Sequence, residues 1–549
     1  MKKFITTLCL ILCLLLAFST VGCTDKDWKV GYEGGAVSSN GGFSVEVGDY
    51  VYFINGIATA TDNNDFGNPV KGSLVRMKKS ELANPKSATS AEVVVPKLFA
   101  SSYYDAGVTI FNDYVYYASP NSDTNKKGEV LNSQLVFYKT KLDGTDTKKL
   151  VTCDSLSQEY KFVTVGENIY LITVTASSTD SSSSGSSSAS TYTLKVYDAN
   201  SGAEIFVKEE ADSYAIPTEI TVAENAGYIF FTDKIKDEEE QDKEYGALYA
   251  YKLGEEKQGV LFSGAIEDGD FGTKGYLFKA INYVNGCLYF TDYNVNSSED
   301  GLFYHFIDVT QASVKVLDTE SDTFKADNQA NYALKEDLQD VLGATVKTAI
   351  AKTSTFASKT EIIYYENSVG LVVYNYQGES EVLVYASKLS TLTSPTFKTI
   401  YNGYAYFTDS GNLVYRIKLG DSNATVSKIT PVATNTSWYN IEIVTVSGVD
   451  YVLLNLNGEP YNSYIYAFEA DLEAKIAREK ASELPDVTAS DYQDKLDEMV
   501  EEYFKNVTDK KEDAINALID ARIGTITQLD KNSVNSYMSS NYASSSSSN

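Results

Sequence analysis

The chain is dominated by short runs of Val, Ile, Tyr and Phe, each of which follows a turn rich in Gly, Asn or Asp. Runs of β-branched and aromatic residues between such turns are typical of β-strands. Eight of them begin a repeated unit, at 47–56, 111–119, 165–173, 224–233, 284–292, 366–375, 401–409 and 446–455. Each is followed by a second run that often closes on a basic residue, at 74–79, 135–144, 193–198, 247–254, 302–308, 383–389, 413–420 and 464–470. The pattern therefore predicts eight β-hairpins.

A hairpin repeated in this way cannot bury both of its faces alone, so the units must stack on one another. Radial stacking of small antiparallel sheets keeps their edges short and protected, and it gives a β-propeller. We therefore predict an all-β fold with a propeller over residues 43–470. The repeat count indicates eight blades, whereas the uneven spacing of the units also fits seven or six.

Two segments interrupt the repeat. Leu334, Leu338, Val341 and Leu342 recur at helical spacing within 331–352, which predicts a helical insertion on one face of the propeller. The serine-rich stretch 177–190 separates the two strands of the third unit, and its composition predicts a flexible loop.

After residue 470 the apolar positions change from a period of two to a period of 3.6. The two apolar stripes are Leu496, Met499, Val500 and Phe504, and then Ile515, Leu518, Ile519 and Ile523. We predict a helical segment over 471–530, followed by a disordered Ser/Asn tail at 531–549. The stripes fit docking on the chain's own body and, as the alternative, a site for a partner.

Three of the repeated strands contain Phe-Thr-Asp, which ends at Asp233, Asp292 and Asp409. The motif resembles the Tyr-Trp-Thr-Asp repeat of low-density-lipoprotein-receptor-type propellers, with Phe in the Trp position. The chain as a whole resembles bacterial surface lipoproteins that carry a divergent propeller of this type and unknown function. The resemblance implies that the aromatic residue packs between blades and that the three aspartates are structural, since in that family the aspartate ties neighbouring backbone.

Residues 1–22 have the parts of a secretory signal: Lys2 and Lys3, an apolar core over 8–17, and small residues before a cleavage site. The following residue is Cys23, and the stretch 20–23 resembles a bacterial lipobox, in which the cysteine sulfur receives diacylglycerol. Two acyl chains suffice for a stable membrane anchor. We predict lipidation of Cys23 and a tether over 23–42, with Trp28 in a strand that closes the ring against the last blade. Ordinary cleavage near Gly22 is the alternative.

Removal of residues 1–22 takes away two of the 46 basic residues and none of the 75 acidic ones, which moves the formal charge from −29 to −31. Nucleic acids and anionic bilayers both attract Lys and Arg. The composition therefore argues against nucleic-acid binding and against direct docking on an anionic membrane. It fits a solvated domain on the outer side of the bacterial cell membrane, attached only through its lipid.

His305 is the only histidine, and it stands in a strand-like run, so we predict a strand residue rather than a catalytic base. Beyond Cys23, the cysteines that stay after removal of the signal are Cys153 and Cys287. A disulfide between them fits the composition, but the apolar run around Cys287 favours a buried free thiol.

The stretch 292–300 offers oxygen ligands at alternate positions, Asp292, Asn294 and Asn296, of the kind that Ca²⁺ prefers. It lacks the glycine and the final glutamate of an EF-hand loop. A weak calcium site and a solvated hairpin loop are the two interpretations.

The sequence indicates no catalytic residues. We predict a lipid-anchored extracytoplasmic propeller that acts as a binding or scaffold module for an envelope protein or a glycan, without a cofactor other than this calcium. The alternative is a carbohydrate-active enzyme, a glycoside hydrolase or lyase, whose paired carboxylates would converge at the propeller channel with perturbed pKa values.

Overall fold

A computed structural model of the chain describes most of the repeated units and the helical segment that follows them. The described residues are 37–38, 44–54, 74–83, 92–95, 97, 99, 108–128, 131, 133–154, 158–177, 191–211, 220–223, 227–236, 244–255, 258–263, 276–284, 286–294, 303–337, 356–358, 361–375, 380–411, 413–430, 441–456, 464–508 and 522–525. The predicted signal, Cys23, Trp28, Asn296, the tail 531–549 and residues 178–190 of the serine-rich stretch lie outside them.

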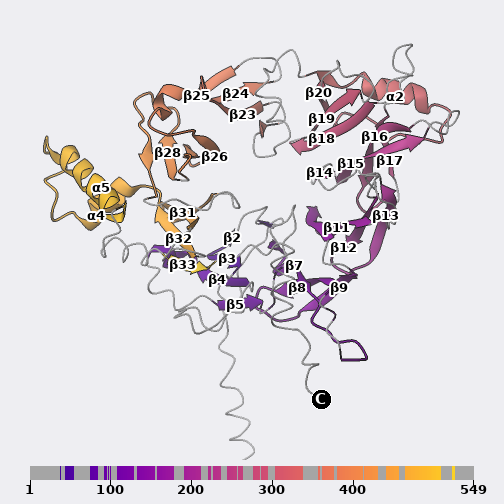
Figure 1. The fold of residues 1–549 in the computed structure, drawn as a ribbon, viewed down its shortest axis with the longest axis horizontal. Helices are drawn as coiled ribbons and strands as arrows, with labels where there is room; N and C mark the ends of the chain where they lie inside the picture. Colours follow the sequence, from indigo (N-terminus) through magenta and orange to yellow (C-terminus); the bar gives the residue numbers. More distant parts are fainter. Residues whose placement is uncertain are drawn as a thin grey trace, which may run out of the picture.

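The described strands form eight antiparallel sheets, which follow one another in chain order around a ring (Figure 1). The first sheet is β2 (Ser44–Val47), β3 (Tyr50–Ile54), β4 (Leu74–Lys78) and β5 (Glu92–Val95); the second is β1 (Val37–Ser38), β6 (Thr109–Phe111), β7 (Tyr114–Pro120), β8 (Leu135–Lys141) and β9 (Lys148–Cys153); the third is β10 (Gln158–Val165), β11 (Asn168–Ser177), β12 (Thr191–Asp198) and β13 (Glu204–Ala211); the fourth is β14 (Ile220–Ala223), β15 (Tyr228–Lys236), β16 (Glu244–Lys252) and β17 (Gln258–Ser263).

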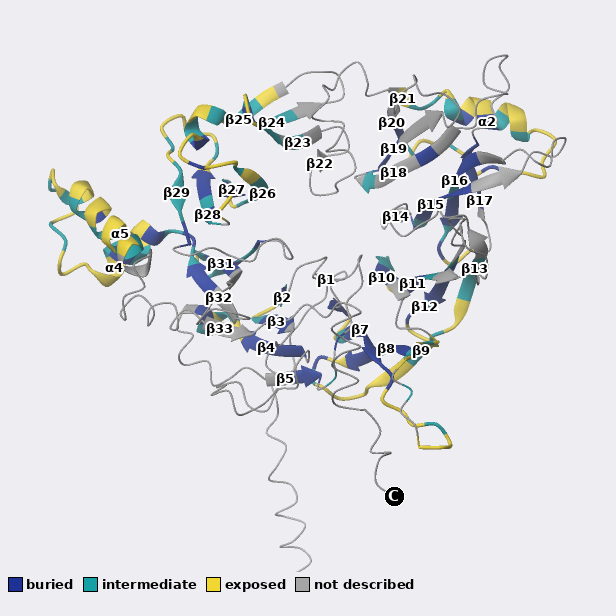
Figure 2. Cartoon of the chain, in the orientation of Figure 1, coloured by how far each residue is buried: buried dark blue, intermediate teal, exposed yellow. Residues whose placement is uncertain are grey.

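The second half of the ring repeats this plan. The fifth sheet is β18 (Tyr276–Val284), β19 (Cys287–Asn294), β20 (Phe303–Asp308) and β21 (Glu336–Asp337); the sixth is β22 (Phe356–Ser358), β23 (Glu361–Glu366), β24 (Gly370–Asn375) and β25 (Ser380–Tyr385); the seventh is β26 (Thr396–Tyr401), β27 (Tyr404–Thr408), β28 (Val414–Lys418) and β29 (Ser427–Lys428); the eighth is β30 (Glu442–Val446), β31 (Val449–Leu456), β32 (Tyr464–Glu469) and β33 (Arg522–Thr525). In each sheet the first strand lies nearest the centre of the ring and the last at its rim (Figure 2).

The eight sequence repeats coincide with the eight sheets. The runs that begin the repeats form β3, β7, β11, β15, β19, β24, β27 and β31, and the second runs form the next strand of each sheet. The predicted all-β propeller is therefore confirmed, and the number of sheets agrees with the count of eight units. In the sixth sheet β22 precedes the repeated unit, so that the run at 366–375 forms the third strand of four.

The core lies between neighbouring sheets, and it explains why the repeated strands are apolar on both faces. Consecutive strand residues point to opposite faces. In β15, Phe231 packs in the cluster shared with the third sheet, whereas Phe230 packs in the cluster shared with the fifth. In β27, Phe407 and Tyr406 divide in the same way between the sixth and the eighth sheets. Full burial of one such side chain stabilises the fold by about 1.5–3 kcal/mol.

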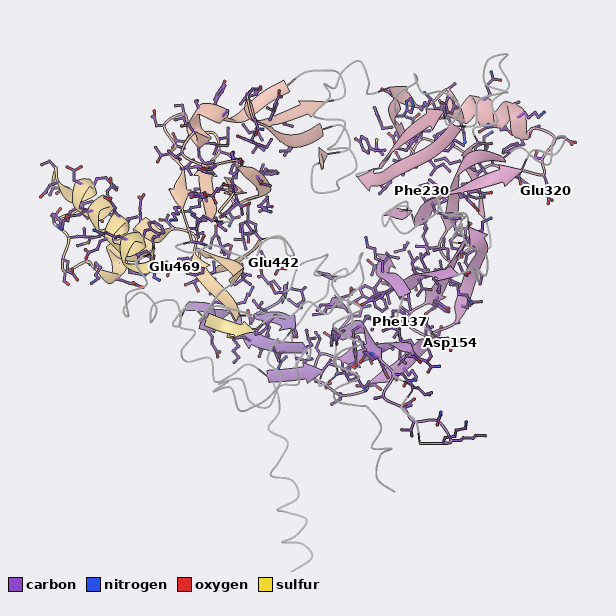
Figure 3. The ribbon with its side chains drawn as sticks, in the orientation of Figure 1. Phe137, Asp154, Phe230, Glu320, Glu442 and Glu469 are labelled. Carbon is purple, nitrogen blue, oxygen red and sulfur yellow. The ribbon has the colours of Figure 1, made fainter. Side chains whose placement is uncertain are left out.

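The ring closes by side-chain packing between its first and last sheets. Val51, Phe53 and Met77 of the first sheet share a buried cluster with Val444 and Leu453 of the eighth. The short helix η1 (Lys79–Ala83) contributes Leu82 to the same cluster. The carboxylate of Glu442 in β30, which is labelled in Figure 3, accepts hydrogen bonds from the backbone N–H and the hydroxyl of Ser44 in β2.

The described part of the segment before the first sheet pairs with the second sheet. Val37 and Ser38 form β1, which pairs antiparallel with Ile110 and Thr109 of β6 and so adds an inner strand to the second sheet. The strand predicted at Trp28, which would close the ring against the last blade, lies outside the described residues and stays a prediction.

A helix lies before the predicted helical segment 331–352. This helix, α2, spans Phe324–Tyr332, and the chain then turns into β21. Leu334 is a half-buried residue of that turn, and residues 338–355 lie outside the described part. α2 and the segment before it cover the outer strand of the preceding sheet. Val260 of β17 exchanges two backbone hydrogen bonds with Leu317, at 2.9 and 2.8 Å. A Cβ at Gly259 would lie 2.4 Å from the Leu317 carbonyl oxygen, so that this close approach requires glycine.

In chain order, the helices α4 (Leu472–Glu479) and α5 (Tyr492–Thr508) come between the third and fourth strands of the eighth sheet. After the helices the chain returns to this sheet, where β33 pairs with β32. The first predicted stripe is confirmed as helical: Leu496, Met499, Val500 and Phe504 pack with Leu472 and Ile476 of α4. The second is wrong at Ile523, which lies in β33. Residues 509–521 lie outside the described part.

The helical pair docks on the propeller itself. Tyr503 packs in the cluster between the seventh and eighth sheets, and the Lys428 ammonium lies 4.8 Å from the centre of the Phe504 ring. This contact supports the first of the two interpretations of the α5 stripe, docking on the chain's own body.

Candidate functional site

Three junctions between sheets bury a cation beside a pair of tyrosines. In the first sheet, Arg76 lies opposite Tyr52 in the β3–β4 register, and its guanidinium carbon is 4.3 Å from the centre of the Tyr50 ring. The Arg76 side chain is almost fully buried. A cation over an aromatic face is stabilised electrostatically, and more strongly when water is excluded.

The same arrangement recurs in two other sheets. Lys139 lies opposite Tyr116, with its ammonium 5.2 Å from the Tyr114 ring centre. Arg416 lies opposite Tyr406, with its guanidinium carbon 4.2 Å from the Tyr404 ring centre. The basic residues that close the second runs here are Lys78, Lys141 and Lys418, whereas each buried cation stands two positions earlier, opposite the second tyrosine of a Tyr-x-Tyr in the preceding strand. That spacing was the available signal.

Burial determines the chemistry of these groups. Desolvation raises the pKa of Tyr52 and raises the pKa of Tyr406 to about 12, although the neighbouring Arg416 opposes the second shift. Desolvation also lowers the pKa of Lys139. The two tyrosines therefore stay neutral at physiological pH, and the three clusters join sheets rather than provide a general base.

The three aspartates of the repeat differ in their surroundings. Asp409 accepts hydrogen bonds from the backbone N–H groups of Gly411 and Leu413 and from the Tyr415 hydroxyl, all within its own hairpin. Asp233 is buried and pairs with the Lys208 ammonium of the third sheet at 2.9 Å. Asp292 lies in β19, where only its backbone is described. The carboxylates of Asp409 and Asp233 therefore both bind groups of the protein itself.

The predicted calcium ligands are only partly placed. Asp292 and Asn294 stand two residues apart in β19, where only their backbone is described, and Asn296 lies outside the described residues. Among the residues whose side chains the structure describes, no cluster of His, Cys, Asp or Glu has the arrangement of a metal site. Calcium binding at this hairpin stays a prediction.

His305 is confirmed as a strand residue: it lies buried in β20, with its Nδ1 3.3 Å from the Lys335 ammonium and its ring 5.5 Å from that of Phe290. Neither Cys153 nor Cys287 forms a disulfide. Cys153 lies in the second sheet, where burial raises its pKa to about 11, and Cys287 is buried in the fifth. The prediction of a buried thiol without a disulfide at Cys287 is confirmed.

Carboxyl groups with perturbed pKa values lie away from the centre of the ring in the described part of the chain. The Tyr114 hydroxyl and Lys148 hold the pKa of Asp146 low in the β8–β9 turn, and hydrogen bonds from Thr488 hold that of Asp486 low between α4 and α5. Desolvation beside Asp471 and Asp497 raises the pKa of Glu473 in α4. These groups do not converge on one another as a pair of glycosidase carboxylates would.

The two faces of the ring are built differently. Because neighbouring strands are antiparallel, every connection from the innermost strand of a repeated unit to the next strand emerges on one face. We call this the turn face; its described connections are 48–49, 112–113, 166–167, 367–369, 402–403 and 447–448, together with Gly227 and Gly286. Several of these turns have two residues at positive φ, such as Asn402 (45°) and Gly403 (78°), which is the geometry of tight hairpins.

On the opposite face, which we call the loop face, the second strand of each repeated unit ends and the third begins. Along the sequence, the intervals between these strand ends are longer and unequal: 55–73, 121–134, 178–190, 237–243, 295–302, 376–379, 409–413 and 457–463. Of these intervals, the structure describes 121–128, 131, 133–134, 409–411 and 413.

No protein-family model matches the chain, and no curated protein matches it by sequence. The tricorn protease has a similar fold, with 9% identity, a TM-score of 0.33, and coverage of 72% of this chain and 36% of that one. This chain therefore spans about a third of the tricorn protease. The β-propeller domain of the Trilobed protease from Pyrococcus furiosus (10% identity, TM-score 0.30) is covered to 94%, over 78% of this chain. The polysaccharide lyase Uly1 (10% identity, TM-score 0.31) is covered to 96%, over 72% of this chain.

Likeness at this level concerns the fold and carries no argument about a ligand or a reaction. In the described residues, no helix is both long enough and apolar enough to cross a bilayer.

Proposed function

We propose that this protein is a lipid-anchored extracytoplasmic β-propeller that acts as a binding or scaffold module at the bacterial cell surface. The observation that carries the proposal is Cys23, which directly follows a secretory signal and ends a lipobox-like stretch. A diacylglyceryl group on its sulfur would supply the two chains that stable anchoring needs. The Phe-Thr-Asp repeats, which resemble those of surface lipoproteins with divergent propellers, support the same assignment.

The architecture supports binding more than catalysis. The described strands form a ring of eight sheets, and the sequence intervals at its loop face are long and unequal. The buried ionisable groups described above are engaged in contacts between sheets. Envelope proteins and glycans are the ligand classes that a surface location brings within reach. The strongly acidic composition disfavours nucleic acids as ligands.

The experiment is an intact-mass measurement of the protein extracted from its own membranes, with a Cys23→Ala variant as the control. We expect a mature chain that begins at Cys23 with the added mass of a lipid, and we expect the variant in the soluble fraction. An unlipidated chain cleaved near Gly22 and released in soluble form would refute the anchor.

The carbohydrate-active alternative predicts a different result for the same preparation. An enzyme incubated with polysaccharides of the cell's surroundings would release oligosaccharides, whereas a binding module would release none. Mass spectrometry of the soluble products distinguishes the two functions.

A further inference from the structure

The first strand of each repeated unit has one edge that pairs with the next strand and one edge that faces the centre of the ring (Figure 2). The tight turns determine which residues direct their backbone toward the centre. Residues that flank a two-residue turn exchange hydrogen bonds with each other, and the bonded positions then alternate along the strand. In β6, Phe111 and Tyr114 flank the turn at 112–113, so the backbone N–H and C=O of Ile110 point away from β7 and toward the centre.

An extended segment of the chain itself occupies this edge of β6. Val37 of β1 pairs antiparallel with Ile110, and β1 thereby adds a fifth strand to the second sheet. Addition of an extended segment to a sheet edge is a general mode of peptide recognition, in which the main chain supplies the hydrogen bonds. The contact at Ile110 is an example of such binding at the centre of this ring.

The same register gives equivalent groups on β30 of the eighth sheet. Val446 and Val449 flank the turn at 447–448, so Thr445 and Ile443 direct their backbone groups toward the centre. Both residues are half-buried, and in the part of the chain that the structure describes no hydrogen bond reaches these groups from the centre. Unpaired N–H and C=O groups in a row form a template for another strand.

The neighbouring edge of β2 binds an acceptor from outside its own sheet. Val47 and Tyr50 flank the turn at 48–49, so the N–H of Ser44 also points toward the centre, where it donates to the Glu442 carboxylate at 3.2 Å. Glu442 belongs to β30, but this contact uses only its side chain. The backbone groups on the inner edge of β30 therefore stay available while the contact is formed.

We propose that the inner edge of β30 binds an extended polypeptide segment of an envelope protein by strand addition. The proposal rests on the proposed function, because it names the class of ligand for that binding module. Ile443 packs with the cluster between the seventh and eighth sheets, so the partner residue directly opposite it lies against an apolar surface. A β-branched residue fits this position, as Val37 does in the sequence of β1 opposite Ile110.

Amide hydrogen exchange with a peptide probe tests the proposal. The probe is the ten-residue peptide with the sequence of residues 33–42, which contains the segment that pairs with β6. Its control is the same peptide with Val37→Pro, because proline lacks the N–H that strand pairing needs. We expect the probe to slow exchange of the Ile443 and Thr445 amides of the full-length protein by the factor 1 + [peptide]/Kd. The control should leave both rates unchanged.

Two results would overturn the proposal. One is unchanged exchange at both amides with the probe at its limit of solubility, and the other is equal slowing by the probe and its proline control, which would show binding without main-chain pairing. The variant Ile443→Pro gives a second measurement, since it removes an inward N–H but no hydrogen bond to β31. If this variant keeps the circular-dichroism spectrum of the parent, the probe should no longer slow exchange at Thr445; retained slowing would contradict strand addition at this edge.

Failure of the proposed function gives a separate signature. The exchange measurement needs no lipid on Cys23, so it is made on the membrane-extracted protein and on its Cys23→Ala form. If the probe binds but intact mass shows no lipid, the strand-addition site holds and the anchor is refuted. If the protein is lipidated but its inward amides do not respond, the anchor holds and only the strand-addition site is refuted.

Discussion

Asp471 joins a buried cation to the start of a helix. Its Oδ2 lies 2.9 Å from the Arg416 guanidinium, whose side chain is only 8% exposed, and its Oδ1 accepts the backbone N–H of Ala474 as the N-cap of α4. The carboxylate is half-exposed, so that its ion pair is partly screened by water. The two contacts can be separated, because asparagine caps a helix as well as aspartate does but carries no charge.

We therefore predict unequal effects of two substitutions at this position. Asp471→Asn should lower the free energy of unfolding by less than about 1 kcal/mol, the loss of a screened ion pair. Asp471→Ala should lower it by about 1 kcal/mol more, because the cap is lost too. Urea midpoints of the two variants measure the difference, with exposed Glu501→Gln on α5 as the control. Equal midpoints for the two Asp471 variants would contradict the role of the cap.

Among the contacts of the candidate site, those that the sequence predicts join residues close together in the chain. The partners of Asp409 stand two, four and six residues after it in the chain, so that a Phe-Thr-Asp with a Gly two residues after the Asp already indicates a hairpin held by that Asp. The partner of Asp233 is Lys208, on the outer strand of the neighbouring sheet. Nothing in the spacing of those two residues distinguishes their contact from many others, because it arises only when two sheets pack.

Between elements, α2 completes the edge of a sheet to which it does not belong. The Asn328 side chain accepts the backbone N–H of Ser263 at 2.8 Å and donates to the Ser263 carbonyl oxygen at 3.1 Å, as a neighbouring strand would. Asn331 donates to the Leu261 carbonyl oxygen at 3.0 Å. Both asparagines are buried, so water does not replace these bonds. An outer edge that could otherwise pair with another chain is thereby covered.

We expect Asn328→Ala to destabilise the protein by about 2–4 kcal/mol, since it removes two hydrogen bonds from the buried backbone of Ser263. Gln329→Ala, on the exposed side of the same helix, should change stability by less than about 0.5 kcal/mol. Hydrogen exchange adds a local measurement: the Ser263 amide should lose protection in the first variant and keep it in the second. Retained protection together with retained stability would refute the edge closure.

Some elements are predicted by the pattern of the sequence, whereas others form strands only because they pair with a strand distant in the chain. The eight aromatic strands were predictable because each is buried on both faces and is preceded by a turn whose Gly or Asn accepts positive φ, as at Asn402 and Gly403. β33 was not, because Ile523 continues an apolar spacing of helical period but pairs with the open edge of β32. β1 was not either, since two residues, Val37 and Ser38, carry no periodicity at all.

Across the whole molecule, burial of tyrosines couples the stability of the ring to alkaline pH. The chain has 42 tyrosines, and those between sheets are strongly desolvated. Desolvation raises the pKa values of Tyr138, Tyr249 and Tyr406 to about 12 each, above the value near 10 of an unfolded chain. Their contribution to stability is complete below pH 10 and is lost as the pH rises from 10 toward 12, because only the unfolded state ionises there.

Each such tyrosine adds a slope of about 1.4 kcal/mol per pH unit in that window, so three of them alone give roughly 4 kcal/mol per unit. We predict cooperative alkaline unfolding, in which tyrosinate absorbance and loss of the β circular-dichroism signal rise together. Tyr406→Phe should reduce the slope by about 1.4 kcal/mol per pH unit in urea titrations between roughly pH 10 and 11, whereas Tyr385→Phe should leave it unchanged, since Tyr385 is 62% exposed. Equal slopes for the two variants, or full ionisation with the β signal intact, would show that the buried rings do not hold the sheets together in the way their positions indicate.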